Sequence, residues 1–128
     1  TLNQHPMVDT DIAVPLDMVE TFLARMGDRL RALDPAATDV VVSHLGDGNV
    51  HYTAFPSRDD AALLDAIRDA VDDVTVGLHG SFSAEHGIGL SKLPSMRARK
   101  DPVALDMMRR LKQAFDPAGI LNPGKTIP

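Results

Sequence analysis

The spacing of apolar residues predicts three amphipathic helices. The first covers residues 16–33 and ends at Asp34-Pro35; its apolar positions are Val19, Phe22, Leu23, Met26, Leu30 and Leu33. The second follows Ser57, which we interpret as an N-cap with Asp60 three residues later; its apolar face consists of Leu64, Ile67, Val71 and Val74. The third begins at Asp101-Pro102, an N-cap followed by a proline at the first helical position; its inward side chains should be Leu105, Met108, Leu111 and Phe115.

Short β-prone segments alternate with these helices. Asp11–Val14 predicts a strand, Val40–Phe55 a hairpin, and Val76–Ser83 a further strand that leads into a glycine-rich turn. The order is then β-α-β-β-α-β, followed by a helix and an irregular tail from Ile120. This order predicts an α+β fold with ferredoxin-like elements, in which helices pack on one face of an antiparallel sheet. We expect a single domain over residues 1–128.

Composition narrows the class of protein. The chain has 128 residues, 44% of them hydrophobic, and a net charge of −5. Its basic residues are scattered, which argues against nucleic acid or an anionic membrane surface as a partner. No apolar run approaches the length that a bilayer requires, and we take the cytoplasm as the default location. Because cysteine is absent, any metal must bind nitrogen and oxygen ligands.

Two histidines flank a glycine-rich turn in the segment SHLGDGNVHYTAF, residues 43–55. If Asp47-Gly48 is the centre of a type I′ turn, the cross-strand pairs are Gly46 with Asn49, Leu45 with Val50, and His44 with His51. Directly opposed side chains have Cβ atoms about 4.5–5.5 Å apart, so two imidazoles there could bind one metal ion. The alternative is a hairpin whose histidines are only cross-strand neighbours.

The segment SAEHGIG supplies a third candidate ligand, Glu85, next to His86. Adjacent side chains on an extended backbone point in opposite directions, so we expect Glu85 to bind the metal and His86 to remain free for proton transfer. Two imidazoles and one carboxylate suit zinc best, although manganese and iron also accept such a set. The alternative is that Glu85 caps a helix and His86 has no special role.

Three segments together, SHLGDGNVHYTAF, GSFSAEHGIGLSK and FDPAGILNPGK, resemble the C-terminal region of FAD-linked oxidases of the vanillyl-alcohol-oxidase type. The most similar branch contains the D-lactate, glycolate and D-2-hydroxyglutarate dehydrogenases. The resemblance implies that His44, His51 and Glu85 bind a divalent metal. It also implies that His86 accepts the substrate's hydroxyl proton while a hydride passes to FAD. Asn122 is implied as a neighbour of the flavin, near which Glu85 and His86 would also lie.

The sequence departs from that branch at three positions. Ser43 replaces a usual glycine, Thr53 replaces an asparagine near the substrate, and Asp9 replaces a lysine expected to meet a substrate carboxylate. The sequence therefore leaves open which 2-hydroxy acid is oxidised, and it does not indicate the electron acceptor.

The resemblance assigns the flavin pyrophosphate site to a different, N-terminal domain. The chain contains no glycine-rich phosphate loop in a βαβ setting, so we expect it to be a C-terminal portion that is inactive alone. Ile120-Leu121 would then lose a partner surface, so we expect either homo-oligomerisation of the chain or a poorly ordered tail. Two other interpretations remain: a stand-alone binding or dimerisation module with a vestigial site, and a small metal-dependent hydrolase.

Overall fold

A computed structural model describes residues 6–44 and 46–128 of the protein. The elements in chain order are β1 (Val8–Ala13), a 3₁₀ turn η1 (Leu16–Met18), α1 (Val19–Leu33), β2 (Thr38–His44), β3 (Asn49–Phe55), α2 (Ala61–Gly77), α3 (Leu93–Arg99) and α4 (Pro102–Phe115). This mixture of an antiparallel sheet and helices confirms the predicted α+β class. The chain divides into two compact units, one through His86 and one from Gly87 to Pro128.

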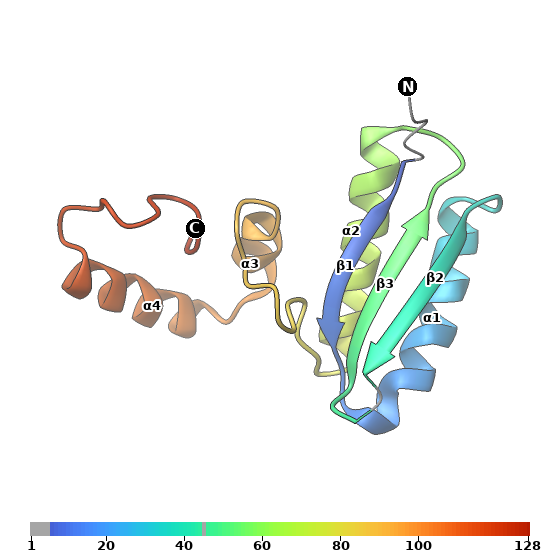
Figure 1. Cartoon of the computed structure of the whole chain (residues 1–128), viewed down its shortest axis with the longest axis horizontal. Coiled ribbons are helices and arrows are strands. Elements are labelled where there is room, and N and C mark those ends of the chain that lie inside the picture. Colours follow the sequence, from blue (N-terminus) through green and yellow to red (C-terminus); the bar gives the residue numbers. More distant parts are fainter. Residues whose placement is uncertain (1–5, 45) are drawn as a thin grey trace. The chain divides into compact units, whose positions relative to one another are not determined.

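The first unit contains an antiparallel sheet with the strand order β1-β3-β2. Helices α1 and α2 lie side by side against one face of this sheet (Figure 1). Side chains alternate between the two faces of a strand. Val50, Tyr52 and Ala54 of β3 are therefore buried toward the helices, whereas His51 and Thr53 lie on the opposite face and are only partly buried.

The core between sheet and helices is built on an aromatic contact. The rings of Phe22 on α1 and Tyr52 on β3 meet edge to face, with their centroids 5.9 Å apart and their planes at 89°. Both side chains are fully buried, together with Ile67 and Val71 of α2. Full burial of each such side chain stabilises the folded state by about 1.5–3 kcal/mol. The helix positions predicted to be apolar in α1 and α2 therefore include the residues that form the core.

The prediction of a strand over Val76–Ser83 is wrong. Helix α2 continues through Gly77, and the chain then turns at His79, whose φ is 60°. The helix is favoured because Val74 and Leu78 extend its apolar face by one more turn, and both are buried. Of the predicted strand, only a single bridge between Ser81 and Ala13 of β1 is present.

Ser57 is not the N-cap of α2, contrary to the prediction. Asp60 caps this helix, because its side chain accepts a hydrogen bond from the backbone N–H of Ala62. Ser57 instead donates its backbone N–H and its hydroxyl to Asp34, the residue that ends α1. A long-range hydrogen bond thus replaces the local capping box.

The second unit contains α3 and α4. Asp101 caps α4 as predicted, accepting from the N–H of Ala104, whereas the seven-residue helix α3 was not predicted. Leu105 is buried, but Leu111 and Phe115 are exposed, so the prediction that they face inward is wrong for this unit. An apolar stripe shows which side chains can be buried, and it does not supply the surface that covers them.

Hydrogen bonds from its backbone N–H groups hold the irregular tail to the end of α4. Asp116 accepts the backbone N–H groups of Ile120 and Leu121, and Lys112 donates to the same carboxylate. The Lys112 ammonium group lowers the pKa of Asp116 to about 2. The side chains of Ile120 and Leu121 nevertheless remain exposed.

Over the described residues, no helix combines the length and the apolar character that are needed to span a bilayer.

Candidate functional site

The register of the histidine hairpin differs from the prediction. His44 pairs with Asn49 instead of His51, and His51 pairs with Val42. Leu45, the predicted partner of Val50, lies outside the described residues, and Ser43 takes this place in the ladder. The connection is thus two residues longer than a two-residue type I′ turn.

A tertiary contact at Gly48 explains the longer connection. The carbonyl oxygen of Gly48 accepts the backbone N–H of Val14 at 3.0 Å, which ties the turn to the end of β1. Gly48 has a φ of +75°, and a Cβ atom at this position would lie 2.1 Å from the carbonyl oxygen of Val14. Only glycine permits this approach.

The two histidines nevertheless lie on the same face of the sheet. A register shift of two residues keeps every side chain on its face, whereas a shift of one residue would separate the pair. The rings of His44 and His51 are diagonal neighbours with centroids 5.7 Å apart. The structure therefore brings the two imidazoles together, although not as a directly opposed pair.

The segment after α2 brings Glu85 and His86 to the same face. Nε2 of His51 lies 3.1 Å from Oε1 of Glu85, and the rings of His51 and His86 are 5.5 Å apart. The backbone bends at residues 84–86 instead of being extended, so the two adjacent side chains do not diverge. Nε2 of His86 lies 3.7 Å from Oε1 of Glu85.

Asp11 is a member of this cluster that the sequence analysis did not select. It pairs with His51 across β1 and β3, and only 4% of its side chain is exposed. Its Oδ2 atom lies 3.6 Å from Nδ1 of His86. A charged residue in a short β-prone segment was the available signal, because burial of a carboxylate usually requires specific partners.

The cluster contains donor atoms that could hold a divalent metal, but not in the predicted set. Among the described residues, one donor atom each of Asp11, His51 and His86 lie within 4.8 Å of one another, and this group contains neither His44 nor Glu85. Two ligands at about 2.0–2.1 Å from a tetrahedral ion lie about 3.3 Å apart, close to the 3.1 Å between His51 and Glu85. His44 adjoins the group through its ring contact with His51.

Asn49 supplies a further polar atom beside the histidines. It is directly opposite His44 on the neighbouring strand, and by strand alternation it shares a face with His51. Within residues 6–44 and 46–128, its buried Oδ1 atom has no hydrogen-bond partner. A buried amide oxygen without a partner costs free energy, so a ligand that donates a hydrogen bond would be stabilised here.

Asn122 belongs to the second unit. It has a left-handed backbone with a φ of 47° and lines a hollow of 320 Å³ together with Arg109, Lys112 and Gly124. That Asn122 is a neighbour of the flavin stays a prediction.

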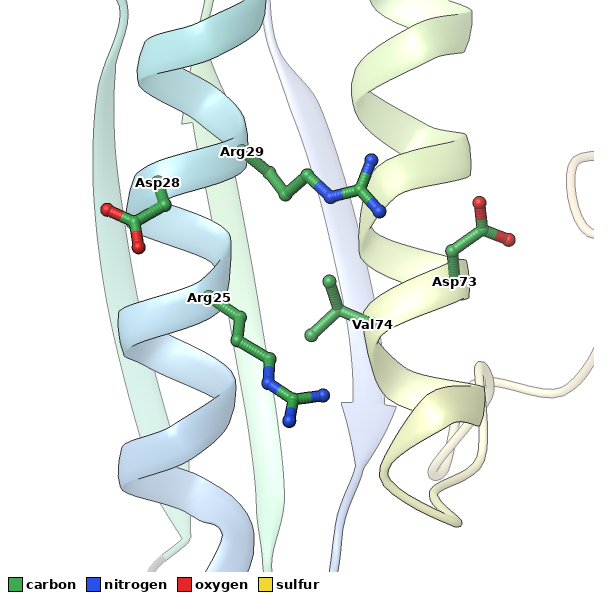
Figure 2. Close-up of a pocket in the computed structure, with 5 residues that line it drawn as sticks. All are labelled: Arg25, Asp28, Arg29, Asp73 and Val74. Carbon is green, nitrogen blue, oxygen red and sulfur yellow. The ribbon is translucent and has the colours of Figure 1, made fainter.

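Another hollow, of 340 Å³, lies between α1 and α2. Figure 2 shows Arg25 and Arg29 of α1 extending toward α2, which contributes Asp73 and Val74. These helices cover the face of the sheet opposite His51, so this hollow is separate from the histidine cluster.

Comparison with known proteins identifies a related family. The model of the family described as "FAD linked oxidases, C-terminal domain" matches residues 2–126. A mitochondrial D-2-hydroxyglutarate dehydrogenase from Bos taurus is 42% identical over 119 residues, which are 92% of this chain and 21% of that protein. An FAD-linked oxidoreductase from Mycobacterium tuberculosis, described as uncharacterized, is 40% identical over 114 residues, 89% of this chain and 24% of its own length.

A more distant relative matches a similar share of both chains. The mitochondrial D-2-hydroxyglutarate dehydrogenase of Arabidopsis thaliana is 34% identical over 118 residues, 92% of this chain and 21% of that protein. The chain therefore spans between a fifth and a quarter of the length of these curated relatives.

Proposed function

Because this chain belongs to the family of FAD-linked oxidase C-terminal domains, we propose that it is part of an FAD-dependent enzyme that oxidises a D-2-hydroxy acid to the 2-oxo acid. The observation that carries this proposal is the contact of His51 with both Glu85 and His86 on the face of the sheet opposite α1 and α2. Three proton-accepting or metal-binding groups there suit removal of a proton from a hydroxyl group.

His44, His51 and Glu85 would hold a divalent metal, and their donor types favour zinc over manganese or iron. When bound, the metal supplies a Lewis acid at the substrate hydroxyl and the flavin supplies a hydride acceptor. His86 would accept the hydroxyl proton. Its side chain is 62% exposed, so a substrate can reach the ring.

The hollow in the second unit suits a polar cofactor edge. Asn122 and Arg109 offer hydrogen-bond donors there. Gly124 also lines the hollow, and because it has no side chain a ligand could approach its backbone closely. We propose that Asn122 contacts the flavin, which would be held mainly by a part of the protein beyond these 128 residues.

The polar residues next to the cluster bear on the substrate. Thr53 donates its hydroxyl to Oδ1 of Asp9 at 2.7 Å, and the two residues pair across β3 and β1. Asp9 lies on the same face as Asp11, two residues away on β1, and is exposed. We propose that this carboxylate disfavours a second carboxylate on the substrate, so that a monocarboxylate of the lactate or glycolate type is preferred to 2-hydroxyglutarate.

The test is oxidation by the intact, flavin-containing protein with an artificial electron acceptor. D-lactate, glycolate and D-2-hydroxyglutarate are compared before and after chelation, and then after addition of zinc, manganese or ferrous ions. We expect activity that is lost on chelation and restored by one of these metals, and strongly reduced activity for His86→Asn. His79→Asn is the matched control, because His79 is exposed on a turn and asparagine tolerates its φ of 60°.

Metal-dependent ester or amide hydrolysis without oxidation of any hydroxy acid would favour the hydrolase interpretation instead.

A further inference from the structure

Three consecutive backbone amides converge on one residue of β1. The N–H of Ala84 donates to the carbonyl oxygen of Asp11 at 3.1 Å. The N–H of Glu85 lies 3.2 and 3.3 Å from the two carboxylate oxygens of Asp11, and the N–H of His86 lies 3.0 Å from Oδ2. Asp11 thus binds the backbone of both residues that carry the proposed chemistry.

These contacts determine where the two side chains lie. Among residues 6–44 and 46–128, the bridge at Ser81 is the one strand-like pairing of the segment that follows α2. The bend at residues 84–86 is therefore held to the sheet by Asp11 and not by a ladder of hydrogen bonds. Asp11 is also the residue of β1 that pairs with His51 of β3, so it connects the bend to the strand that carries His51.

A carboxylate is the group that these amides require. Asp11 is buried, and a buried charge is stabilised only when several hydrogen bonds replace its water shell. Both of its oxygens accept, one from Glu85 and the other from both Glu85 and His86. Asparagine has the same shape but offers one oxygen and one NH₂ group, so one backbone N–H would face a donor.

We propose that Asp11 is a positioning residue that holds the bend at Ala84–His86, and thereby places the Glu85 carboxylate at His51 and the His86 ring beside both. The significance of these positions rests on the proposed function; the positioning itself does not. Oδ2 of Asp11 also lies 3.6 Å from Nδ1 of His86, which is longer than a hydrogen bond, so the backbone amides are the contacts that carry the positioning.

The test compares Asp11→Asn with Asp9→Asn in the intact protein. Both residues are on the same strand and face, but Asp9 accepts from the hydroxyl of Thr53 and not from the bend. Hydrogen exchange of peptides over residues 81–89 is measured beside peptides of β3 and α2. We expect exchange at 81–89 to accelerate at least about tenfold in Asp11→Asn alone, with the core peptides unchanged, because the bend loses hydrogen bonds to a charged group.

Zinc binding and steady-state kinetics provide two further measurements. Displacement of Glu85 and His86 should weaken zinc binding and lower kcat by about 10- to 100-fold in Asp11→Asn, with KM changed less than kcat. Unchanged exchange at 81–89 in a folded Asp11→Asn protein would overturn the proposal. Weaker zinc binding with unchanged exchange would also overturn it, because Asp11 would then act as a ligand.

The exchange measurement also separates this proposal from the proposed function. If the protein oxidises no hydroxy acid and binds no metal, the function fails, while faster exchange confined to residues 81–89 still supports the positioning role.

Discussion

Nε2 of His51 and Oε1 of Glu85 lie 3.1 Å apart, one on the central strand of the sheet and the other on the bend after α2. This is the distance of an ion pair between an imidazole and a carboxylate, and it is also close to the separation of two ligands around one small divalent ion. The contact joins the two sequence motifs that carry the candidate chemistry, and His86 adjoins both residues. Five predictions follow from this arrangement and from the fold that supports it.

Substitution of His51 should weaken metal binding strongly. In His51→Gln, the proposed metal site loses one imidazole ligand, so the dissociation constant for zinc should rise on the order of 100-fold or more. Residues that only hydrogen-bond to metal ligands typically change the affinity by about 10- to 100-fold. Isothermal titration with zinc measures this change. His79→Asn should bind zinc as the unsubstituted protein does, and equal affinities for the two variants would exclude His51 as a ligand.

Reversal of the charge at Asp9 should change the substrate preference. In Asp9→Lys, a second substrate carboxylate would meet an ammonium group, a difference worth about 1 kcal/mol for an exposed pair. The ratio of kcat/KM for D-2-hydroxyglutarate to that for D-lactate should therefore rise about fivefold. Asp39→Lys makes the same charge change on exposed β2, and a similar rise there would refute a local effect of Asp9.

Asp34 should stabilise the fold in a pH-dependent way. The backbone hydrogen bond from Ser57 is the largest influence on this carboxyl and lowers its pKa below the ordinary value of 3.8, although burial acts in the opposite direction. A lowered pKa stabilises the folded state above that ordinary value, and the stabilisation is lost as the pH falls through the folded-state pKa.

Asp34→Asn should therefore lower Tm by a few degrees at pH 7, and the difference from the unsubstituted protein should narrow below about pH 4. Thermal unfolding from pH 7 to pH 2 measures the effect. Asp59→Asn, at an exposed position in the connection between β3 and α2 that also contains Ser57, is the control. A difference that widens on acidification would contradict the prediction.

The edge-to-face contact of Phe22 and Tyr52 should be central to stability. Phe22→Ala removes a fully buried ring and leaves a cavity, so the free energy of unfolding should fall by about 3–5 kcal/mol. Leu23→Ala changes the adjacent residue of α1, which is 37% exposed, and should cost much less. Urea unfolding of both variants measures the two costs, and equal values would show that the core lies elsewhere.

The 128-residue chain studied alone should self-associate. Phe115, Ile120 and Leu121 are 82%, 75% and 61% exposed, while Asp116 holds the backbone that carries the last two. Exposed apolar surface of this kind drives association. Light scattering should give a mass that rises with concentration and falls in the double variant Ile120→Ser/Leu121→Ser, but not in Val76→Ser. A constant monomer mass would contradict this prediction.

The local parts of the fold could be predicted from the sequence. The apolar spacing of α1 and α2, the stop at Asp34 and the cap at Asp101 depend on residues within one or two helical turns. The common face of His44 and His51 was also predictable, because strand alternation survives a register shift of two residues. The family could be inferred because its motifs are continuous in the sequence.

Contacts between distant segments decided the rest. The hairpin register depends on the approach of Gly48 to Val14, and the end of α2 depends on the burial of Leu78. The bend at Glu85 and His86 depends on a carboxylate of β1, and the sequence could show only that this charged residue lies in a short β-prone segment, not which groups it binds. Periodicity reports which face a side chain occupies, but the free energy of a close approach or of a buried charge depends on the group opposite, and only the tertiary structure brings that group near.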